Sequence, residues 1–243
     1  MQTKNTANKE EINKFDKIAE EWWNPNGKFA PLHKFNPIRQ EYLIDQISNH
    51  FNLNLNEDKP LNNLKILDVG CGGGLLCEPL SRLGANVTGI DAAKTNIEVA
   101  KIHMEQSGLD INYLNKKPED IENKLYDVVL CMEIIEHVED VNFFIQSCIN
   151  LLKPNGLIFF ATLNKTIKSY VLAIIGAEYI LRWLPIGTHE WDKFISPNNI
   201  INKVSKHFLT HVETKGVTFN PLKNKWKLSD DTDVNYMCYF KKT

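Results

Sequence analysis

The fold of this chain is decided by Leu67-Asp68-Val69-Gly70-Cys71-Gly72-Gly73-Gly74, where a short apolar run passes directly into a glycine-rich loop. We predict that a strand over Lys65 to Val69 ends at this loop and that a helix follows it. In an open α/β sheet the ligand crevice lies at the carboxyl ends of the strands, and glycines there let a ligand approach the backbone and the helix N-terminus. A glycine-rich turn that only packs strand on helix explains the loop equally well when it is taken alone.

Short β-rich runs alternate with longer amphipathic runs along the chain that follows the loop. Because parallel neighbours need right-handed crossover connections, this alternation predicts an α/β, doubly wound, mostly parallel sheet with helices on both faces. Two further runs near the C-terminus predict an antiparallel edge of the sheet. The predicted parallel strands are Lys65 to Val69, Asn86 to Ile90, Ile111 to Leu114, Tyr126 to Cys131 and Leu157 to Thr162, and the edge runs are His207 to Phe219 and Val234 to Lys241.

The residues ahead of the sheet have a helical pattern with interruptions. An amphipathic period begins at Lys9 and stops near Asn24-Pro25-Asn26-Gly27, and a second period runs from Ile38 to Phe51. Lys28 to Pro37 is expected to be irregular because of its prolines. The predicted organisation is a disordered tail at 1–8, an N-terminal helical unit at 9–63 and the main domain at 64–243.

Composition excludes several classes of protein. With 43% hydrophobic and 24% charged residues among 243, the chain has the composition of a globular protein. The net charge of -2 provides no basic surface for a phosphate backbone, so we expect no nucleic-acid partner. Five cysteines without a CxxC pair argue against a zinc ribbon or a disulfide framework, and the first fifteen residues lack the apolar segment of a secretory signal. We therefore expect a cytoplasmic protein.

Asp91 is the second element of the predicted ligand site. It ends the second strand, seventeen positions after Gly74, where a carboxylate can accept both hydroxyls of a ribose. A dinucleotide loop requires GxGxxG, but Leu75 stands where the last glycine is needed. The loop and Asp91 together therefore predict a nucleoside-bearing cofactor without a pyrophosphate.

The segment after the fourth strand carries a group of ionisable side chains. Glu133, Glu136 and His137 stand at i, i+3 and i+4 and share one face if the segment is helical. They are candidates to bind a divalent cation, for which Mg²⁺ suits the carboxylates, or to supply a general base that removes a phenolic proton. A solvated helix start, with acids near the positive end of its dipole, explains the same residues. Met132 is placed to cover the bound nucleoside.

Seven segments together resemble the ubiquinone biosynthesis O-methyltransferases of the class I S-adenosyl-L-methionine-dependent superfamily. The glycine motif marks only the superfamily, whereas the tryptophan pair, PLHKFNPIR and the GAEYIL to GTHE stretch are more specific. The segments are Phe15 to Trp23 (FDKIAEEWW), Pro31 to Arg39 (PLHKFNPIR), Leu67 to Leu75 (LDVGCGGGL), Cys131 to Val138 (CMEIIEHV), Gly176 to Leu181 (GAEYIL), Gly187 to Glu190 (GTHE) and Asp233 to Met237 (DVNYM).

The resemblance implies a Rossmann-like class I methyltransferase fold and a specific reaction. Methyl would pass from S-adenosyl-L-methionine to ring hydroxyls of 2-polyprenyl-6-hydroxyphenol and 3-demethylubiquinol. The cofactor-binding positions it implies are Arg39, Gly70, Asp91 and Met132. Eukaryotic relatives resemble the chain at Glu133, Glu136 and His137 and are associated with magnesium there.

Roles for Arg39 and for the base follow from this reaction. Arg39 can reach back over the crevice to the carboxylate of the cofactor, which makes 9–63 an N-terminal helical lid. A phenol of pKa ~10 needs a base or a cation to become a good nucleophile, so Glu136 and His137 are the predicted catalytic residues, ahead of His33 and His189. A class I methyltransferase for another soluble small molecule and a non-catalytic nucleoside-binding scaffold are the alternatives.

The stretch 166–188 is the most hydrophobic in the chain. Glu178, Arg182 and Pro185 argue against a membrane-spanning helix, while an amphipathic helix at the membrane interface and a buried helix both fit. The resemblance favours an insertion that binds the lipid surface at the inner face of the cell membrane, where a polyprenylated substrate resides. Other quinone-biosynthesis enzymes are further candidate partners.

Overall fold

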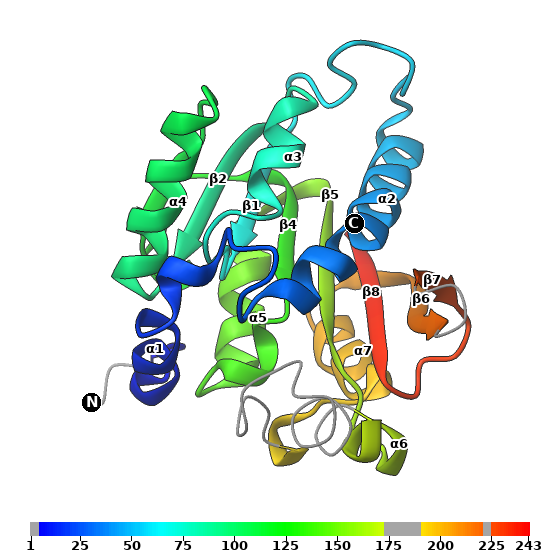
Figure 1. Ribbon diagram of the computed structural model, residues 1–243. Coiled ribbons are helices and arrows are strands. Elements are labelled where there is room, and N and C mark those ends of the chain that lie inside the picture. Colours follow the sequence, from blue (N-terminus) through cyan, green and yellow to red (C-terminus); the bar gives the residue numbers. More distant parts are fainter. Residues whose placement is uncertain (1–4, 173–190, 221–224) are drawn as a thin grey trace.

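The computed structural model of the chain describes residues 5–172, 191–220 and 225–243, and a single mixed sheet organises them (Figure 1). The strand order is β3-β2-β1-β4-β5-β8-β6-β7. Strands β1 to β5 are parallel, and β8 pairs antiparallel with both β5 and β6, which confirms the predicted doubly wound sheet with an antiparallel edge. The strands are β1 (Lys65–Val69), β2 (Asn86–Asp91), β3 (Asn112–Asn115), β4 (Tyr126–Met132), β5 (Leu152–Leu163), β6 (Leu209–Asn220), β7 (Lys225–Ser229) and β8 (Asn235–Lys242).

Helices cover both faces of this sheet, so the domain has three layers (Figure 1). Buried residues of α2, α3 and α4 pack on one face, and those of α5 and α7 pack on the other. The α-helices are α1 (Lys9–Asp16), α2 (Ala30–Phe51), α3 (Cys77–Arg82), α4 (Lys94–Gln106), α5 (Val141–Asn150), α6 (Ile167–Ser169) and α7 (Pro197–Ser205). Short 3₁₀ turns are η1 (Ala19–Glu21), η2 (Pro118–Asp120), η3 (Ile135–His137) and η5 (Trp191–Lys193).

Helix α2 is longer than the sequence predicted, because its prolines do not interrupt it. It begins at Ala30, so Pro31 lies in the first turn, where its missing N–H is not needed. Pro37 stands inside the helix, at a cost of about 3 kcal/mol in an isolated helix. Burial of Leu43 and Ile47, both 0% exposed, offsets this cost. The second half of α2 is thus part of the main core, so the boundary predicted at residue 64 does not separate two cores.

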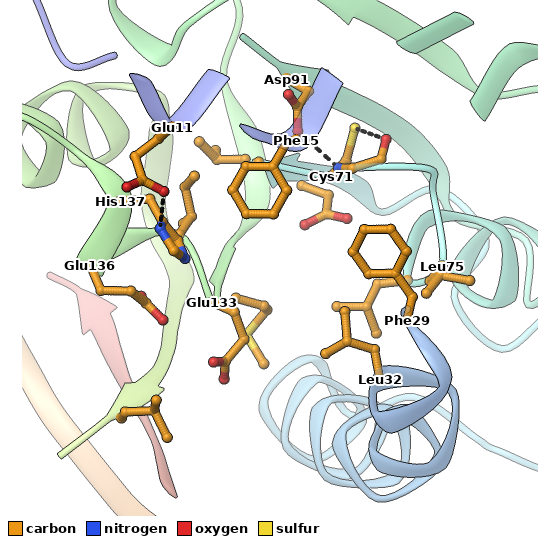
Figure 2. A pocket seen from close by; sticks show the side chains of 18 of the residues that line it. Glu11, Phe15, Phe29, Leu32, Cys71, Leu75, Asp91, Glu133, Glu136 and His137 are labelled. Atoms are coloured by element: carbon orange, nitrogen blue, oxygen red, sulfur yellow. Dashed lines mark hydrogen bonds and ion pairs between the residues drawn. The ribbon is translucent and has the colours of Figure 1, made fainter. Parts of the chain in front are cut away.

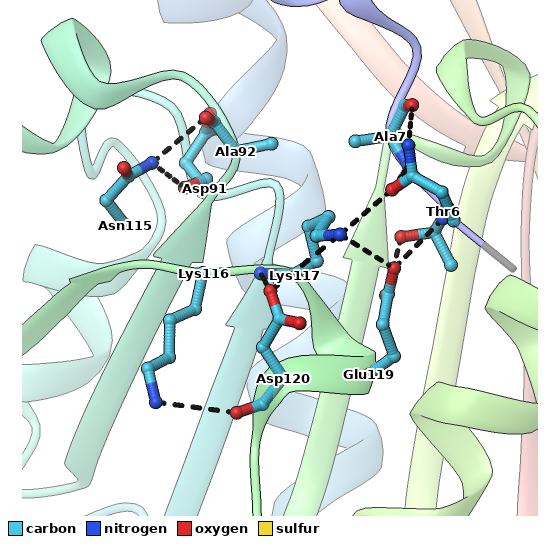
Figure 3. A network of polar contacts seen from close by, with 10 residues as sticks. Thr6, Ala7, Asp91, Ala92, Asn115, Lys116, Lys117, Glu119 and Asp120 are labelled. Atoms are coloured by element: carbon cyan, nitrogen blue, oxygen red, sulfur yellow. Dashed lines mark hydrogen bonds and ion pairs between the residues drawn. The ribbon is translucent and has the colours of Figure 1, made fainter. Parts of the chain in front are cut away.

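The described part of the predicted tail, residues 5–8, is anchored on the sheet domain. The backbone N–H and the hydroxyl of Thr6 donate to the Glu119 carboxylate at 2.9 and 2.6 Å (Figure 3). Ala7 forms a β-bridge with Val138, and Asn8 caps α1. These contacts correct the prediction of disorder for 5–8. The contacts of Thr6 and Ala7 were not predictable from local composition, because their partners lie more than a hundred positions away.

Strand β7 was not predicted from the sequence. It pairs antiparallel with the end of β6, from Gly216 with Ser229 to Asn220 with Lys225. Three of its five residues are exposed and two of these are lysines, so the segment has the composition of a polar link. The exposed edge position of the strand explains this composition, since only one face of it meets the rest of the domain.

Candidate functional site

A cavity of about 720 Å³ lies at the carboxyl ends of β1, β2 and β4. Its floor is the glycine loop with Asp68 and Asp91, one wall is the segment after β4, and the N-terminal segment with the start of α2 covers it (Figure 2). Most of its lining is apolar. A mostly apolar cavity of this size with a few convergent polar groups is typical of a small-molecule site.

The glycine loop has a backbone that only glycine adopts easily. Gly70, Gly72 and Gly74 have φ of +74°, +53° and +90°. A Cβ at Gly72 would overlap the indole of Trp22, which packs directly on the loop. The neighbouring Trp23 donates from its indole N–H to the carbonyl of Gly73 at 2.8 Å. The glycines therefore allow both the left-handed turns and the close approach of the N-terminal segment.

Asp91 lies at the end of β2 with its carboxylate facing the glycine loop. It accepts hydrogen bonds from the backbone N–H groups of Gly72 and Ala93 at 3.0 and 2.8 Å, and from the Asn96 side chain at 3.2 Å. Burial raises the pKa of Asp91 above its ordinary value. Asn115 on β3 holds the backbone here by donating to the carbonyls of Asp91 and Ala92, both at 2.9 Å (Figure 3).

Arg39 reaches the cavity from α2 and is buried there. One terminal nitrogen donates to the Glu133 carboxylate in a short ion pair, the other to Asn36 at 3.3 Å, and the guanidinium lies 3.9 Å from the centre of the Phe35 ring. Its Nε–H donates to no partner among the described residues. Arg39 thus lies where the sequence predicted, but the carboxylate that it binds in this structure belongs to Glu133.

Asp68 is the second buried carboxylate of the cavity floor. The Cys77 thiol donates to it at 3.2 Å, and burial raises the pKa of Asp68 to about 6. A positively charged ligand group placed here would find a carboxylate that is ionised above this pH.

The segment after β4 departs from the predicted helical turn. Glu133 has a φ of +55°, and its N–H donates to the carbonyl of Ala161 on β5 at 2.9 Å. Only Ile135–His137 form a 3₁₀ turn, so Glu133 does not share a helical face with Glu136 and His137. The parallel pairing of β4 with β5 continues one residue past the strand and decides this conformation.

Glu136 and His137 nevertheless both line the cavity, as predicted (Figure 2). The Nδ1 of His137 lies 3.0 Å from the Glu11 carboxylate, while Oε2 of Glu136 is buried and has no partner among the described residues. Burial, reinforced by the charge of Glu133, raises the pKa of Glu136. Burial alone would lower the pKa of His137, but the hydrogen bond with Glu11 and the nearby carboxylates raise it.

The arrangement does not fit a metal ion at the three predicted ligands. Within the described ranges, no group of three or more carboxylate, imidazole or thiol side chains is placed to hold one. Glu133 is engaged by Arg39 and His137 by Glu11. Magnesium at these residues stays a prediction, and no step below depends on it.

Of the two lower-ranked histidines, only His33 lies within the described residues, and it does not line the cavity. His33 has its Nε2 2.9 Å from the backbone carbonyl of Trp22, so it serves a structural hydrogen bond. His189 lies outside the described residues.

Most of the predicted insertion, 173–188, also lies outside the described residues. Within the described part of that insertion, Ile167, Tyr170 and Leu172 are 81%, 44% and 52% exposed. No helix in the described part of the chain combines the length and the apolar character needed to cross a membrane.

Sequence reasoning missed two residues that shape the cavity. Trp22 packs on the glycine loop, and its indole N–H donates to Asn96 at 2.8 Å, which in turn binds Asp91. Glu11 is buried against His137 although it lies on a surface helix. A signal for Glu11 was available, because it stands four positions before Phe15 and therefore on the apolar face of the predicted helix.

Comparisons with known proteins match a family model to the central part of the chain and curated relatives to nearly all of it. The model of the methyltransferase domain family matches residues 67–160. A ubiquinone biosynthesis O-methyltransferase of Pelagibacter ubique is 56% identical over 237 residues, covering 97% of this chain and 98% of the relative. One of Bartonella tribocorum is 52% identical over 244 residues, covering 100% and 99%.

Solved structures show the same fold at low identity. The magnesium protoporphyrin IX methyltransferase of Synechocystis, with bound S-adenosyl-L-homocysteine, has a TM-score of 0.64 at 16% identity and covers 95% of this chain and 94% of its own. An N-methyltransferase of Bradyrhizobium japonicum has a TM-score of 0.59 at 15% identity and covers 96% and 98%. These likenesses confirm the Rossmann-like class I methyltransferase fold predicted from the sequence.

Proposed function

Since the chain belongs to the family of ubiquinone biosynthesis O-methyltransferases and is an S-adenosyl-L-methionine-dependent O-methyltransferase, we propose that its substrates are 2-polyprenyl-6-hydroxyphenol and 3-demethylubiquinol. One feature of the structure supports this proposal. A single cavity joins the glycine loop and Asp91 to His137 and to Glu136, whose Oε2 has no partner among the described residues. The cofactor and a ring hydroxyl can therefore meet in the same cavity.

The residues of the cavity floor would hold the cofactor across the tips of β1, β2 and β4. Asp91 would accept the ribose hydroxyls, and Asp68 would attract the ammonium group. Arg39 would bind the carboxylate, exchanging Glu133 for it or sharing its donors. Gly70 allows the backbone of the loop to approach the ligand, and Met132, which is buried at the end of β4, would pack against the adenosine.

His137 and Glu136 would activate the hydroxyl. When bound, the cofactor supplies a methyl group activated by a sulfonium, and the carbon–sulfur bonding pair stays on sulfur as the oxygen–methyl bond forms. Nε2 of His137 would take the hydroxyl proton and release it to water afterwards. Glu136 Oε2, which has no partner in the described structure, would accept a hydrogen bond from the substrate. The apolar covering of α1 and α2 would exclude water and align the oxygen with the methyl carbon.

We also propose that the enzyme works at the membrane surface. The described start of the predicted insertion, 166–172, exposes Ile167, Val171 and Leu172, and apolar side chains of this kind favour an interfacial position. The segment 166–188 would thus bind the inner face of the cell membrane peripherally and receive the polyprenyl tail. Contacts with other quinone-biosynthesis enzymes stay a prediction.

Purified protein tests these proposals directly. It would be incubated with methyl-labelled S-adenosyl-L-methionine and a prenylated catechol in lipid vesicles, and in parallel with the tail-less catechol in solution. We expect labelled methyl ether mainly from the prenylated catechol, and we expect the protein to cosediment with the vesicles. Turnover of the tail-less catechol alone would identify a soluble substrate instead, and cofactor binding without any turnover would identify a binding protein.

A further inference from the structure

The contact between Glu11 and His137 joins two segments that are far apart in sequence. Glu11 Oε2 lies 3.0 Å from Nδ1 of His137, across 126 positions (Figure 2). The Glu11 side chain is only 7% exposed, although it lies on helix α1. A buried carboxylate is costly unless its hydrogen bonds are satisfied. Its burial against this histidine therefore calls for a chemical reason.

The Glu11 carboxylate is itself held in one orientation. Its Oε1 pairs with Lys14 at 3.1 Å and with Lys193 at 3.2 Å, which leaves Oε2 for His137. Phe15, one turn later on α1, contacts the imidazole edge-on with ring centroids 5.3 Å apart. The imidazole is thus fixed both in its plane and in its rotation by two residues of the same helix.

This contact decides which ring nitrogen can act as a base. An ionised carboxylate only accepts hydrogen bonds, so Nδ1 of the neutral imidazole must carry the hydrogen. Nε2 is then the nitrogen with the free lone pair, and His137 lines the cavity. A hydroxyl in the cavity would meet a base that is already in the required tautomer.

We propose that Glu11 is a positioning residue that holds His137 with Nε2 ready to accept the substrate proton. The inference rests on the proposed function, in which His137 is the base. Because Glu11 belongs to α1, the base would be complete only when this helix covers the cavity.

A purely structural role for the contact explains less, because the N-terminal segment has other anchors. Thr6 is bound to Glu119 by two hydrogen bonds on one side of α1. Trp22 and Trp23 are bound to Asn96 and to the glycine loop on the other side. The helix is therefore attached at both ends without the help of His137.

Variants of Glu11 separate the two roles. At saturating substrate and cofactor, we expect Glu11→Ala to lower kcat about tenfold to a hundredfold, since a poorly aligned base loses most of its contribution. KM and the cofactor Kd should change less than about threefold. Glu11→Gln keeps an oxygen that accepts from Nδ1 and should retain more activity than Glu11→Ala. Thr6→Val is the matched control, because it weakens the anchor of the same segment without contact to the imidazole, and its kcat should stay within about twofold.

Two further measurements make the proposal decisive. In the His137→Gln background, Glu11→Ala should lower kcat no further, because both changes then remove the same interaction. Nitrogen NMR of the neutral imidazole should show the hydrogen on Nδ1 in the unaltered protein and loss of this preference in Glu11→Ala.

Three results would overturn the inference. These are equal losses of kcat in both backgrounds, a Thr6→Val variant as slow as Glu11→Ala, or a hydrogen on Nε2 in the unaltered protein. If His137→Gln keeps full activity, the proposed base is wrong as well. If no methyl ether forms from prenylated catechols even with the unaltered enzyme, the proposed substrate is wrong, while the NMR result still tests the contact.

Discussion

Replacing Asp91 with asparagine should weaken binding of S-adenosyl-L-methionine while leaving the protein folded. The carboxylate accepts three hydrogen bonds in the structure, from Gly72, Ala93 and Asn96. A carboxylate has about four acceptor positions. Of two ribose hydroxyls, one would therefore donate to the vacant position and the other would displace one of the existing donors. We expect the Asn96 side chain to be displaced, because its hydrogen bond is the longest of the three.

The size of the effect follows from this count. A hydrogen bond to a charged group contributes about 1.5–3 kcal/mol, and the displaced one is partly recovered elsewhere. A net loss of about 2–4 kcal/mol raises Kd about 30-fold to 900-fold. In the Asp91→Asn protein, the amide NH₂ replaces one carboxylate oxygen, so one N–H donor loses its acceptor. This loss lowers the free energy of unfolding by about 1 kcal/mol and Tm by about 2–4 °C.

Calorimetric titration of the cofactor, with thermal unfolding of the same samples, measures both quantities. Asn115→Ala is the matched control, because it removes two hydrogen bonds to the backbone at the end of β2 without touching the Asp91 carboxylate. We expect its Kd to rise less than about fivefold. An Asp91→Asn protein that unfolds normally and binds the cofactor within about threefold of the unaltered chain would refute the assignment of the ribose to Asp91.

Three further changes test other parts of the site. Burial raises the pKa of Asp68 to about 6, so this carboxyl is neutral below that pH. Cofactor affinity, measured by calorimetry, should therefore be constant above pH 7 and fall about tenfold per pH unit below pH 6. The Asp68→Asn protein should not show this pH dependence. Gly72→Ala should lower the free energy of unfolding in urea by about 2–5 kcal/mol, because it combines a left-handed backbone with overlap of Trp22, whereas Gly108→Ala, at φ +64° with no neighbour within 4 Å, should lose only about 1–2 kcal/mol. Because Glu133 is engaged by an arginine, EDTA should leave the methylation rate within about twofold; a loss that Mg²⁺ restores would establish the metal site predicted from the sequence instead.

Local sequence patterns were sufficient to predict a structural element or a site residue when these depend only on the residues of their own segment. The five parallel strands were placed within about one residue at most ends. Four of them are largely buried and therefore contain short apolar runs between turn signals, whereas the edge strand β3 is only partly buried. β5 is the exception, since it begins at Leu152, five residues before its predicted start. The glycine loop and Asp91 were recognisable for a related reason, because each directly follows or ends a strand that the sequence predicts, and β1 and β2 are parallel neighbours.

Contacts between distant segments were outside the reach of such patterns. Pro37 argued against a helix locally, yet packing of α2 on the sheet keeps the helix intact. The spacing of Glu133, Glu136 and His137 predicted one helical face, but the hydrogen bond from Glu133 to β5 turns its backbone into the left-handed region.

By itself, the sequence determined the sheet, the crevice at its strand ends and the family of reactions. Only the tertiary structure decided that α1 brings Glu11 to His137 and that Arg39 binds Glu133. The physical reason is that periodicity and spacing indicate which side chains of a single helix or strand are buried and which are exposed. The partner of a buried charge is instead chosen by whichever opposite charge the packed chain brings within hydrogen-bond distance.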